Sequence, residues 1–375
     1  MKEREILEKH FKIAKEQSSK IIKETTDLIR KDIDVLIDKI ESNKSLVSAL
    51  VTSIIKKITT PEQDIRLHRT DFNGGYSARS LDTQVTAIFF KQHFPKYANK
   101  ETAFLTLATR EKIKWDKRNG KNLKIRNKEL KNSYLNIFDN IENKGINPEI
   151  YLNYLLTKLI KLTKNNELIF KKVKSRKTGI LNINLILQML TEHFGINLGS
   201  RLPVVAIYSI YQNLIPVLKR YERKKLINLQ VHTSSDKKGF GDIEIYTLDD
   251  KPFEIVEIKH NIPIDKYLIF DIVKKTENID IDRYYILTTY PKGFENKETE
   301  KEIQDFILEV YKNRKLDIIA NGILTTLKYY LRFIDDYKQF LKTYTDNLIK
   351  EAKNSTEVKN FHIEKWNEIM EKYKL

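Results

Sequence analysis

The chain changes texture after Leu202, and this change constrains the fold more than any other feature of the sequence. Residues 203–224 are apolar at helical spacing, and Pro216 is expected to kink or divide that helix. Four runs rich in β-branched and aromatic residues follow, as is typical of strands: INLQVHT (227–233), DIEIYTL (242–248), PFEIVEIKH (252–260) and RYYILTT (283–289). A helix over about 263–276 separates the third run from the fourth. The order helix, three strands, helix, strand predicts an α/β fold with a mixed sheet.

Helical patterns flank this core on both sides. Residues 1–65 are predicted to be a helical N-terminal region, 66–200 a mainly helical region, 201–322 the α/β core and 323–375 a set of C-terminal helices. A helix from Leu81 to His93 is expected to be capped by Ser80 or Asp82, after a turn at Asn73-Gly74-Gly75. With no internal repeat and no low-complexity linker, we expect one compact body.

The balance of charge indicates a polyanionic partner. The net charge is +17 and the pI is near 9.5, and nucleic acid is the commonest polyanion that a basic protein meets. An acidic membrane surface and a coding bias toward lysine are the alternatives. The absence of cysteine excludes disulfides, thiolate zinc sites and cysteine nucleophiles. No signal peptide and no apolar run of membrane-spanning length are visible, so we expect a cytoplasmic protein.

Two short pieces can carry chemistry: Gly241-Asp242, which opens one strand, and Glu257-Ile258-Lys259 in the next. Side chains alternate along a strand, so Glu257 and Lys259 share a face. If the two strands pair antiparallel, Asp242 lies close to both. Two adjacent carboxylates repel each other unless a cation binds, and Mg²⁺ takes one or two carboxylates together with water and phosphate oxygens. Such a metal can activate a water for attack on a phosphodiester.

The same residues have a plain structural interpretation. Glu257 and Lys259 can form an ion pair on a solvated sheet face, with no catalytic role. If the site is catalytic, Lys259 can hold the phosphate, orient the attacking water or help to deprotonate it, and the sequence leaves these roles open.

The order αβββαβ, with an Asp opening the second strand and EIK in the third, resembles the PD-(D/E)XK nuclease superfamily over about residues 203–290. Gly241 stands where that family usually has proline. The longer strings KKLINLQVHTSSDKKGFGDIEI and FEIVEIKHNIPI, with GYSARSLDT and ETAFLTLATR upstream, resemble a type II restriction endonuclease.

The resemblance implies a Mg²⁺-dependent enzyme that cuts both strands of a short specific duplex and leaves 5′-phosphate and 3′-hydroxyl ends. It also implies a companion DNA methyltransferase. Asp242, Glu257 and Lys259 become the catalytic set, with Asp242 and Glu257 as metal ligands. Family members often carry one more acidic residue on the first core helix; Glu222 is the nearest candidate, and a solvated helix-end glutamate is the alternative.

Several polar residues are candidates for DNA contact, and they make 66–200 the expected DNA-recognition region. Arg79 lies among small residues beside a predicted helix N-terminus, where it can bind phosphate or read guanine. The full set of candidates is Ser77, Arg79, Ser80, Thr106, Thr109, Arg110, His232, Thr233, Ser234, Ser235, Lys237 and Lys238. An ordinary helix start and an ordinary surface loop are the alternatives.

Three functions therefore remain open on the sequence: a restriction endonuclease, a structure-specific or repair nuclease of the same chemistry, and a non-catalytic DNA-binding protein. The first is expected to act as a homodimer, because two active sites related by a twofold axis match a palindromic duplex. The apolar stripes of helices 3–57 and 323–375 are the expected dimer surfaces.

Overall fold

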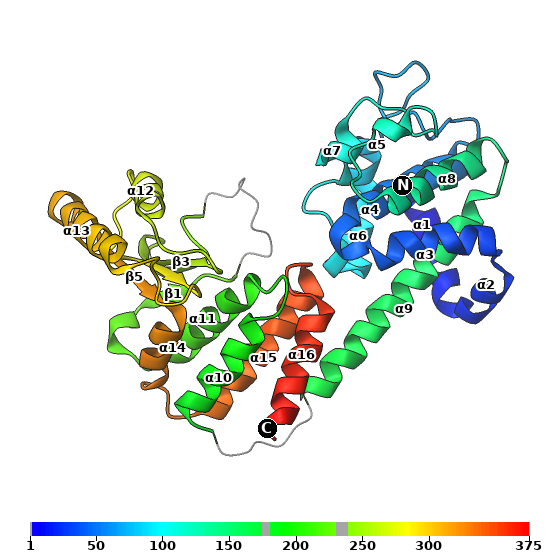
Figure 1. Ribbon diagram of the computed structural model, residues 1–375. Helices are drawn as coiled ribbons and strands as arrows, with labels where there is room; N and C mark the ends of the chain where they lie inside the picture. The colour runs from blue at the N-terminus through cyan, green and yellow to red at the C-terminus, as the bar shows by residue number, and fades with distance from the viewer. Residues whose placement is uncertain (1, 175–180, 230–238, 375) are drawn as a thin grey trace. The chain divides into compact units, whose positions relative to one another are not determined.

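The computed structural model describes residues 2–174, 181–229 and 239–374. These residues form two compact units, where the sequence pattern predicted one compact body. Unit 1 comprises residues 1–168 with 353–356, and unit 2 comprises 169–352 with 357–375. The long helix α9 (Pro148–Lys174) runs from unit 1 into unit 2 (Figure 1).

Unit 1 consists of helices and connecting loops, with no strand among its described residues. Besides the first part of α9 it contains α1 (Lys2–Glu16), α2 (Ser18–Glu24), α3 (Asp27–Asp38), α4 (Ile40–Thr59), α5 (Ala78–Leu81), η1 (Asp82–Thr86), α6 (Ala87–His93), η2 (Pro95–Tyr97), η3 (Ala103–Leu105), α7 (Leu107–Arg110), η4 (Gly120–Asn122) and α8 (Lys128–Glu142). The predicted N-terminal helices are thus present. Their apolar stripes pack on one another and on α8 and α9, in a core that includes Leu7, Ile33, Leu50 and Phe138. The interior of unit 1, rather than an external partner, covers these stripes.

A buried carboxylate organises the middle of unit 1. The sequence predicted Asp82 as a helix cap, but α5 is capped by Ser77, whose Oγ accepts from the Ser80 N–H. Asp82 instead begins the π-helical turn η1 and has no solvent exposure. Its Oδ1 accepts from the hydroxyls of Ser48 and Thr52, both at 3.0 Å, and its Oδ2 from the Thr102 hydroxyl at 2.7 Å.

The Asp82 Oδ2 also accepts from the Ala103 N–H at 2.7 Å. One side chain thereby joins α4, η1 and η3, which are far apart in the sequence. A buried carboxylate with this many donors is costly to remove, because each donor is then left without a partner.

We expect Asp82→Ala to lower the free energy of unfolding by about 3 kcal/mol or more, since four buried donors lose their acceptor. Urea denaturation followed by circular dichroism measures this. Glu62→Ala, at an exposed position of the same unit, should leave stability within about 0.5 kcal/mol of the wild type. An equally small effect at Asp82 would contradict the role given to it here.

Unit 2 is a mixed α/β fold. Its elements are α10 (Ile183–Phe194), α11 (Arg201–Leu214), η5 (Lys219–Tyr221), β1 (Lys224–Leu226), β2 (Ile243–Thr247), β3 (Pro252–Lys259), α12 (Lys266–Lys275), β4 (Arg283–Thr288), α13 (Lys297–Arg314), β5 (Asp317–Gly322), α14 (Ile323–Leu331), α15 (Tyr337–Asn354) and α16 (Asn360–Lys372). The predicted order of helix, three strands, helix and strand is confirmed. Helix α11 ends two residues before Pro216, which cannot continue a helix.

The described strands form one five-stranded sheet in the order β1-β2-β3-β4-β5. The pairs β1/β2 and β2/β3 are antiparallel, whereas β3/β4 and β4/β5 are parallel. The sequence placed the first strand at 227–233, but β1 lies just upstream of that run, and only the Ile227 N–H continues the pairing, to the Glu244 carbonyl. Residues 230–233 lie outside the described residues.

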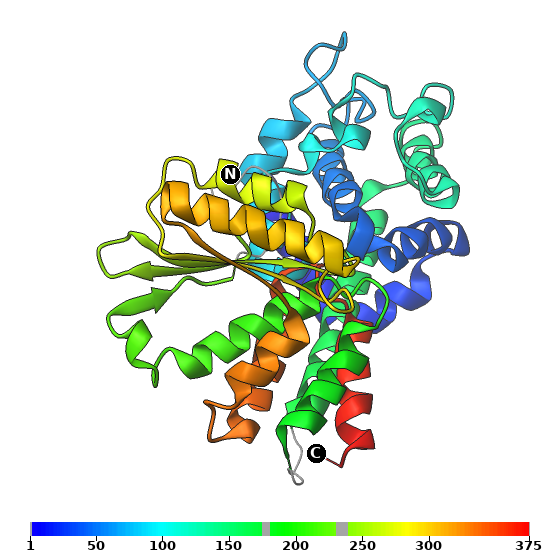
Figure 2. The same cartoon turned by 60° about the vertical axis from the view of Figure 1, so that its left-hand side comes forward.

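Helices cover both faces of this sheet (Figures 1 and 2). One face, with Ile243 and Val256, packs in a core shared with α10, α11 and the C-terminal helices α14–α16. The other face, with Ile255 and Tyr284, packs in a core shared with α12 and α13. The apolar stripe of the C-terminal helices, expected as a dimer surface, is buried in unit 2, where Trp366 is fully enclosed.

None of the helices in the described part of the chain is long and apolar enough to span a membrane.

Candidate active site

Asp242 and the Glu257–Lys259 pair meet at one end of the β2–β3 hairpin. Ile243 pairs with Val256, so Asp242 and Glu257 are the next residues outward on the two strands. The Asp242 N–H donates to the Val256 carbonyl at 2.9 Å, and its Oδ2 accepts from the Ile258 N–H at 2.8 Å. The structure therefore brings together the three residues that the sequence predicted.

Gly241 allows this close approach of the two strands. A Cβ built on Gly241 would lie 2.5 Å from Ile255 Cγ2 and 2.9 Å from the Val256 carbonyl oxygen. A proline, the residue expected at this position from the resemblance, carries a Cβ and would force the strands apart. The departure from the motif therefore matches the local packing.

Lysines neutralise the Glu257 carboxylate from two elements. Lys259 Nζ lies 2.7 Å from Glu257 Oε1, and Lys275 Nζ, at the end of α12, lies 3.8 Å from Glu257 Oε2. The Glu257 side chain is 14% exposed and the Lys259 side chain 25%. This is a largely buried ion pair at one end of the β2–β3 hairpin, and the Lys259 side chain keeps a quarter of its surface exposed.

Asp242 lies in an environment that disfavours its charge. Burial raises its pKa to about 6 and the Glu257 carboxylate adds to the rise, whereas the Ile258 N–H, Arg201 and Lys259 act in the opposite direction. A divalent cation between the two carboxylates would relieve this repulsion.

Three further side chains, which the sequence did not indicate as site residues, lie beside this cluster. Glu244 is 7% exposed, and its Oε1 accepts from the backbone N–H groups of Phe240 and Gly241, which orders the turn into Asp242. Tyr284 donates its hydroxyl proton to the Phe240 carbonyl at 2.6 Å. Burial, and after it the charges of Glu257 and Asp242, raise the pKa of Tyr284 well above its ordinary value. Lys275 is the third.

The period-two pattern of DIEI could have indicated Glu244, because Asp242 and Glu244 are two residues apart on a strand. No sequence pattern indicates Lys275, which reaches Glu257 only because α12 packs on the sheet.

Asp242 and Glu257 are the side chains at this site that could bind a metal ion. Among the described residues, no group of three or more His, Asp or Glu side chains converges as a metal site. Asp242 and Glu257 supply two carboxylates, and Mg²⁺ usually completes its shell with water and substrate phosphate oxygens. These two residues could hold the ion and leave positions open for water and a phosphodiester.

Glu222, the third metal ligand suggested by the resemblance, is not brought to this cluster. It is exposed and immediately precedes β1, whose Lys224 pairs with Thr247 at the far end of β2 from Asp242. The length of β2 separates the two carboxyl groups.

In unit 1 the structure collects four of the residues predicted to contact DNA. A pocket of about 300 Å³ is lined by His68, Arg69, Thr70, Asp71, Ser77, Arg79, Phe104, Thr109 and Arg110. Arg79 and Arg110 are exposed, and their guanidinium groups have no partner in the part of the chain that the structure describes.

The hydroxyl candidates differ in availability. Thr109 is fully buried and donates to the Ala103 carbonyl at 2.7 Å, so its hydroxyl is held inside the protein. Its partner Thr106 is exposed, as are Ser77 and Ser80, whose hydroxyls lie 2.7 Å apart. The remaining candidates lie outside the described residues: His232, Thr233, Ser234, Ser235, Lys237 and Lys238.

Comparison of the sequence with models of known protein families finds no match, and comparison with curated proteins finds none either.

Asp242 predicts a dependence of stability on pH. In the folded protein the pKa of Asp242 is about 6, above the ordinary aspartate value of 3.8. The protonated carboxyl therefore stabilises the fold fully below about pH 4. This contribution is lost as the pH rises through about 6. Relative to Asp242→Asn, we expect the metal-free wild type to lose on the order of 1–3 kcal/mol between pH 4 and 7.

Thermal unfolding across this pH range measures the difference. Added Mg²⁺ should restore stability to the wild type near pH 7 and not to Asp242→Asn, because the metal binds the ionised carboxylate. Asp305→Asn, an exposed carboxyl on α13, is the matched control and should retain the wild-type pH profile. Parallel curves for the wild type and Asp242→Asn would refute the argument.

Proposed function

We propose that this protein is a magnesium-dependent DNA endonuclease of the PD-(D/E)XK kind, and specifically a type II restriction endonuclease. The observation that carries the proposal is the convergence of Asp242, Glu257 and Lys259 at one end of the β2–β3 hairpin. The element order of unit 2, α11-β1-β2-β3-α12-β4, matches the order that the resemblance implies.

The chemistry follows from the charges at this site. Asp242 and Glu257 would hold Mg²⁺, which when bound would supply a Lewis acid for the scissile phosphate and a water of lowered pKa. Lys259, already positioned by Glu257, stabilises the phosphate or assists the attacking water. Hydrolysis then leaves a 5′-phosphate and a 3′-hydroxyl.

Unit 1 supplies a basic surface suited to the duplex. Residues 109–133 contain ten Lys or Arg and three Asp or Glu. Arg118, Lys121, Lys124 and Arg126 are exposed and have no side-chain partner among the described residues. Unpaired cations of this kind bind the phosphate backbone and release its counterions.

Replacing Asp242, Glu257 or Lys259 with Ala should reduce cleavage by about 10³-fold or more, since several kcal/mol of transition-state stabilisation are lost. Binding of duplex DNA should persist. The assay incubates phage DNA with the protein and Mg²⁺, resolves the products on a gel and sequences the fragment ends. Discrete fragments support a restriction enzyme, whereas a preference for branched DNA indicates a repair nuclease.

Glu222→Ala is the matched control, because it removes an exposed carboxylate of the same unit at the far end of β2. It should cut at the wild-type rate. Wild-type cleavage by Glu257→Ala, or uncut DNA with the wild type under all conditions, would refute the nuclease.

Cleavage of both strands needs two active sites, and we propose that two copies of the chain act together on a twofold-symmetric duplex. Unit 2 exposes apolar side chains on α12 and α13, including Tyr267 and Phe270 (81% and 58% exposed). Analytical ultracentrifugation with an uncleavable target should show two chains per duplex. One chain per duplex together with nicks in a single strand would exclude the twofold arrangement.

A further inference from the structure

The unit 1 pocket combines features that a simple phosphate site lacks. Arg79, on α5, and Arg110, at the end of α7, present unpaired guanidinium groups to it. On its wall Asp71 accepts from Arg69 Nε and Nη2, each at 2.9 Å, while Arg69 Nη1 donates to the Arg110 carbonyl. The pocket therefore offers unpaired donors and a carboxylate side by side.

Part of the pocket lining is aromatic and carries no charge. His68 is 1% exposed, and its ring stacks on Trp115 with centroids 3.9 Å apart and planes at 10°. Phe104 also lines the pocket, with its ring 6.1 Å from that of His68. Burial lowers the pKa of His68 to about 4, so the ring is neutral at neutral pH.

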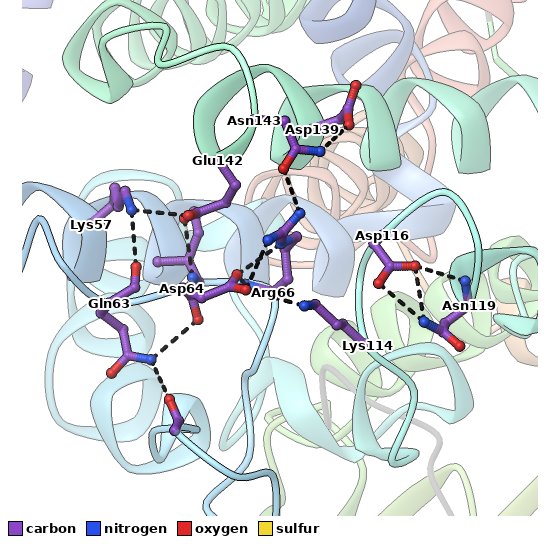
Figure 3. Close-up of polar contacts among 12 residues, drawn as sticks. Lys57, Gln63, Asp64, Arg66, Lys114, Asp116, Asn119, Asp139, Glu142 and Asn143 are labelled. Carbon is purple, nitrogen blue, oxygen red and sulfur yellow. Dashed lines mark hydrogen bonds and ion pairs between the residues drawn. The ribbon is translucent and has the colours of Figure 1, made fainter.

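A network of polar contacts anchors Gln63, Asp64 and Arg66 as well as Lys114, which adjoin the two chain segments that line this pocket (Figure 3). Glu142 Oε1, on α8, accepts from the Ile65 N–H at 3.1 Å, and Lys57 of α4 lies 3.0 Å from Glu142 Oε2. Asp64 accepts from Arg66 Nε at 2.8 Å and lies 3.3 Å from Lys114.

This network ties the segment before His68 to the segment after Arg110. The backbone that adjoins the pocket is thus anchored to α4 and α8. An anchored backbone limits the positions that the pocket's side chains can adopt and favours selective recognition of a ligand.

The ligand follows from these groups. A phosphodiester would be attracted by the three arginines of the pocket, but it offers no donor to the Asp71 carboxylate. A G·C base pair in the major groove presents the acceptors O6 and N7 on guanine beside the N4 amino donor on cytosine. Guanidinium groups suit the first pair of atoms, and a carboxylate suits the last.

We propose that this pocket reads a G·C base pair of the target, with Arg79 and Arg110 donating to guanine O6 and N7 and Asp71 accepting from cytosine N4. Each oxygen of Asp71 keeps a lone pair beyond its bond to Arg69. This inference rests on the proposed DNA substrate, but it concerns recognition and is independent of the catalytic residues of unit 2.

The test selects bound duplexes from a library with a randomised central segment, in the presence of Ca²⁺. The wild type should enrich a motif with at least one fixed G·C pair. Arg79→Ala and Arg110→Ala should lose the preference at that pair and keep it at the other positions. Asp71→Asn should weaken the same position. Arg118→Ala, an exposed and unpaired arginine outside the pocket, should select the wild-type motif.

A second measurement replaces the fixed guanine with 7-deazaguanine, which lacks the N7 acceptor. Affinity of the wild type should fall by about 10- to 100-fold, the usual discrimination of a bidentate arginine contact, while Arg79→Ala and Arg110→Ala should be insensitive. Uniform weakening of all sequences in these variants would show a phosphate contact and overturn the inference, as would an unchanged motif or no motif at all. Selection of a motif that stays uncut with Mg²⁺ would refute the nuclease alone and support the pocket.

Discussion

The antiparallel pairing of β2 with β3 is the contact on which the candidate active site depends. It places Asp242 and Glu257, 15 residues apart in the chain, side by side at the end of the hairpin. Burial and, after it, the charge of Glu257 raise the pKa of Asp242 to about 6. The absence of a side chain at Gly241 lets the strands approach. Glu244 accepts hydrogen bonds from the backbone of the turn that leads into Asp242. A cation bound between the two carboxylates would remove their repulsion.

Buried carboxylates serve opposite purposes in the two units. Asp82 is fully enclosed, and donors from α4 and from the start of η3 satisfy it, so it stabilises unit 1. Glu254 has the same character in unit 2, since Tyr211 and Tyr221 donate to it at 2.7 and 2.9 Å. Among the described residues, Asp242 has one such donor, the Ile258 N–H, and it faces a second carboxylate. The number of hydrogen-bond donors to the carboxylate, rather than its burial, distinguishes a structural acid from a candidate catalytic one.

The division into two units gives the proposed enzyme a division of labour. The catalytic candidates belong to unit 2, and the pocket of Arg79 and Arg110 belongs to unit 1. The residues within each are fixed by that unit's own core. The proposed DNA contacts of unit 1 could therefore be altered by substitution without disturbing the proposed metal site of unit 2. Such a separation would let specificity and chemistry vary independently.

The sequence by itself determined the elements of unit 2 and the residues of the hairpin site. Runs of β-branched and aromatic residues indicate strands, and the period of two places Glu257 and Lys259 on one face. Local sequence pattern is therefore enough to predict these features. The sequence pattern misplaced β1, because a strand of three residues leaves little signal. It also indicated Asp82 as a helix cap, because an aspartate at a helix start and a buried aspartate look alike in the sequence. Only the tertiary structure decided that Glu222 lies at the wrong end of β2, that Lys275 reaches Glu257, and that Arg79 and Arg110 share a pocket with Asp71. These contacts join residues distant in the chain, and packing between elements, which no local pattern encodes, brings them together.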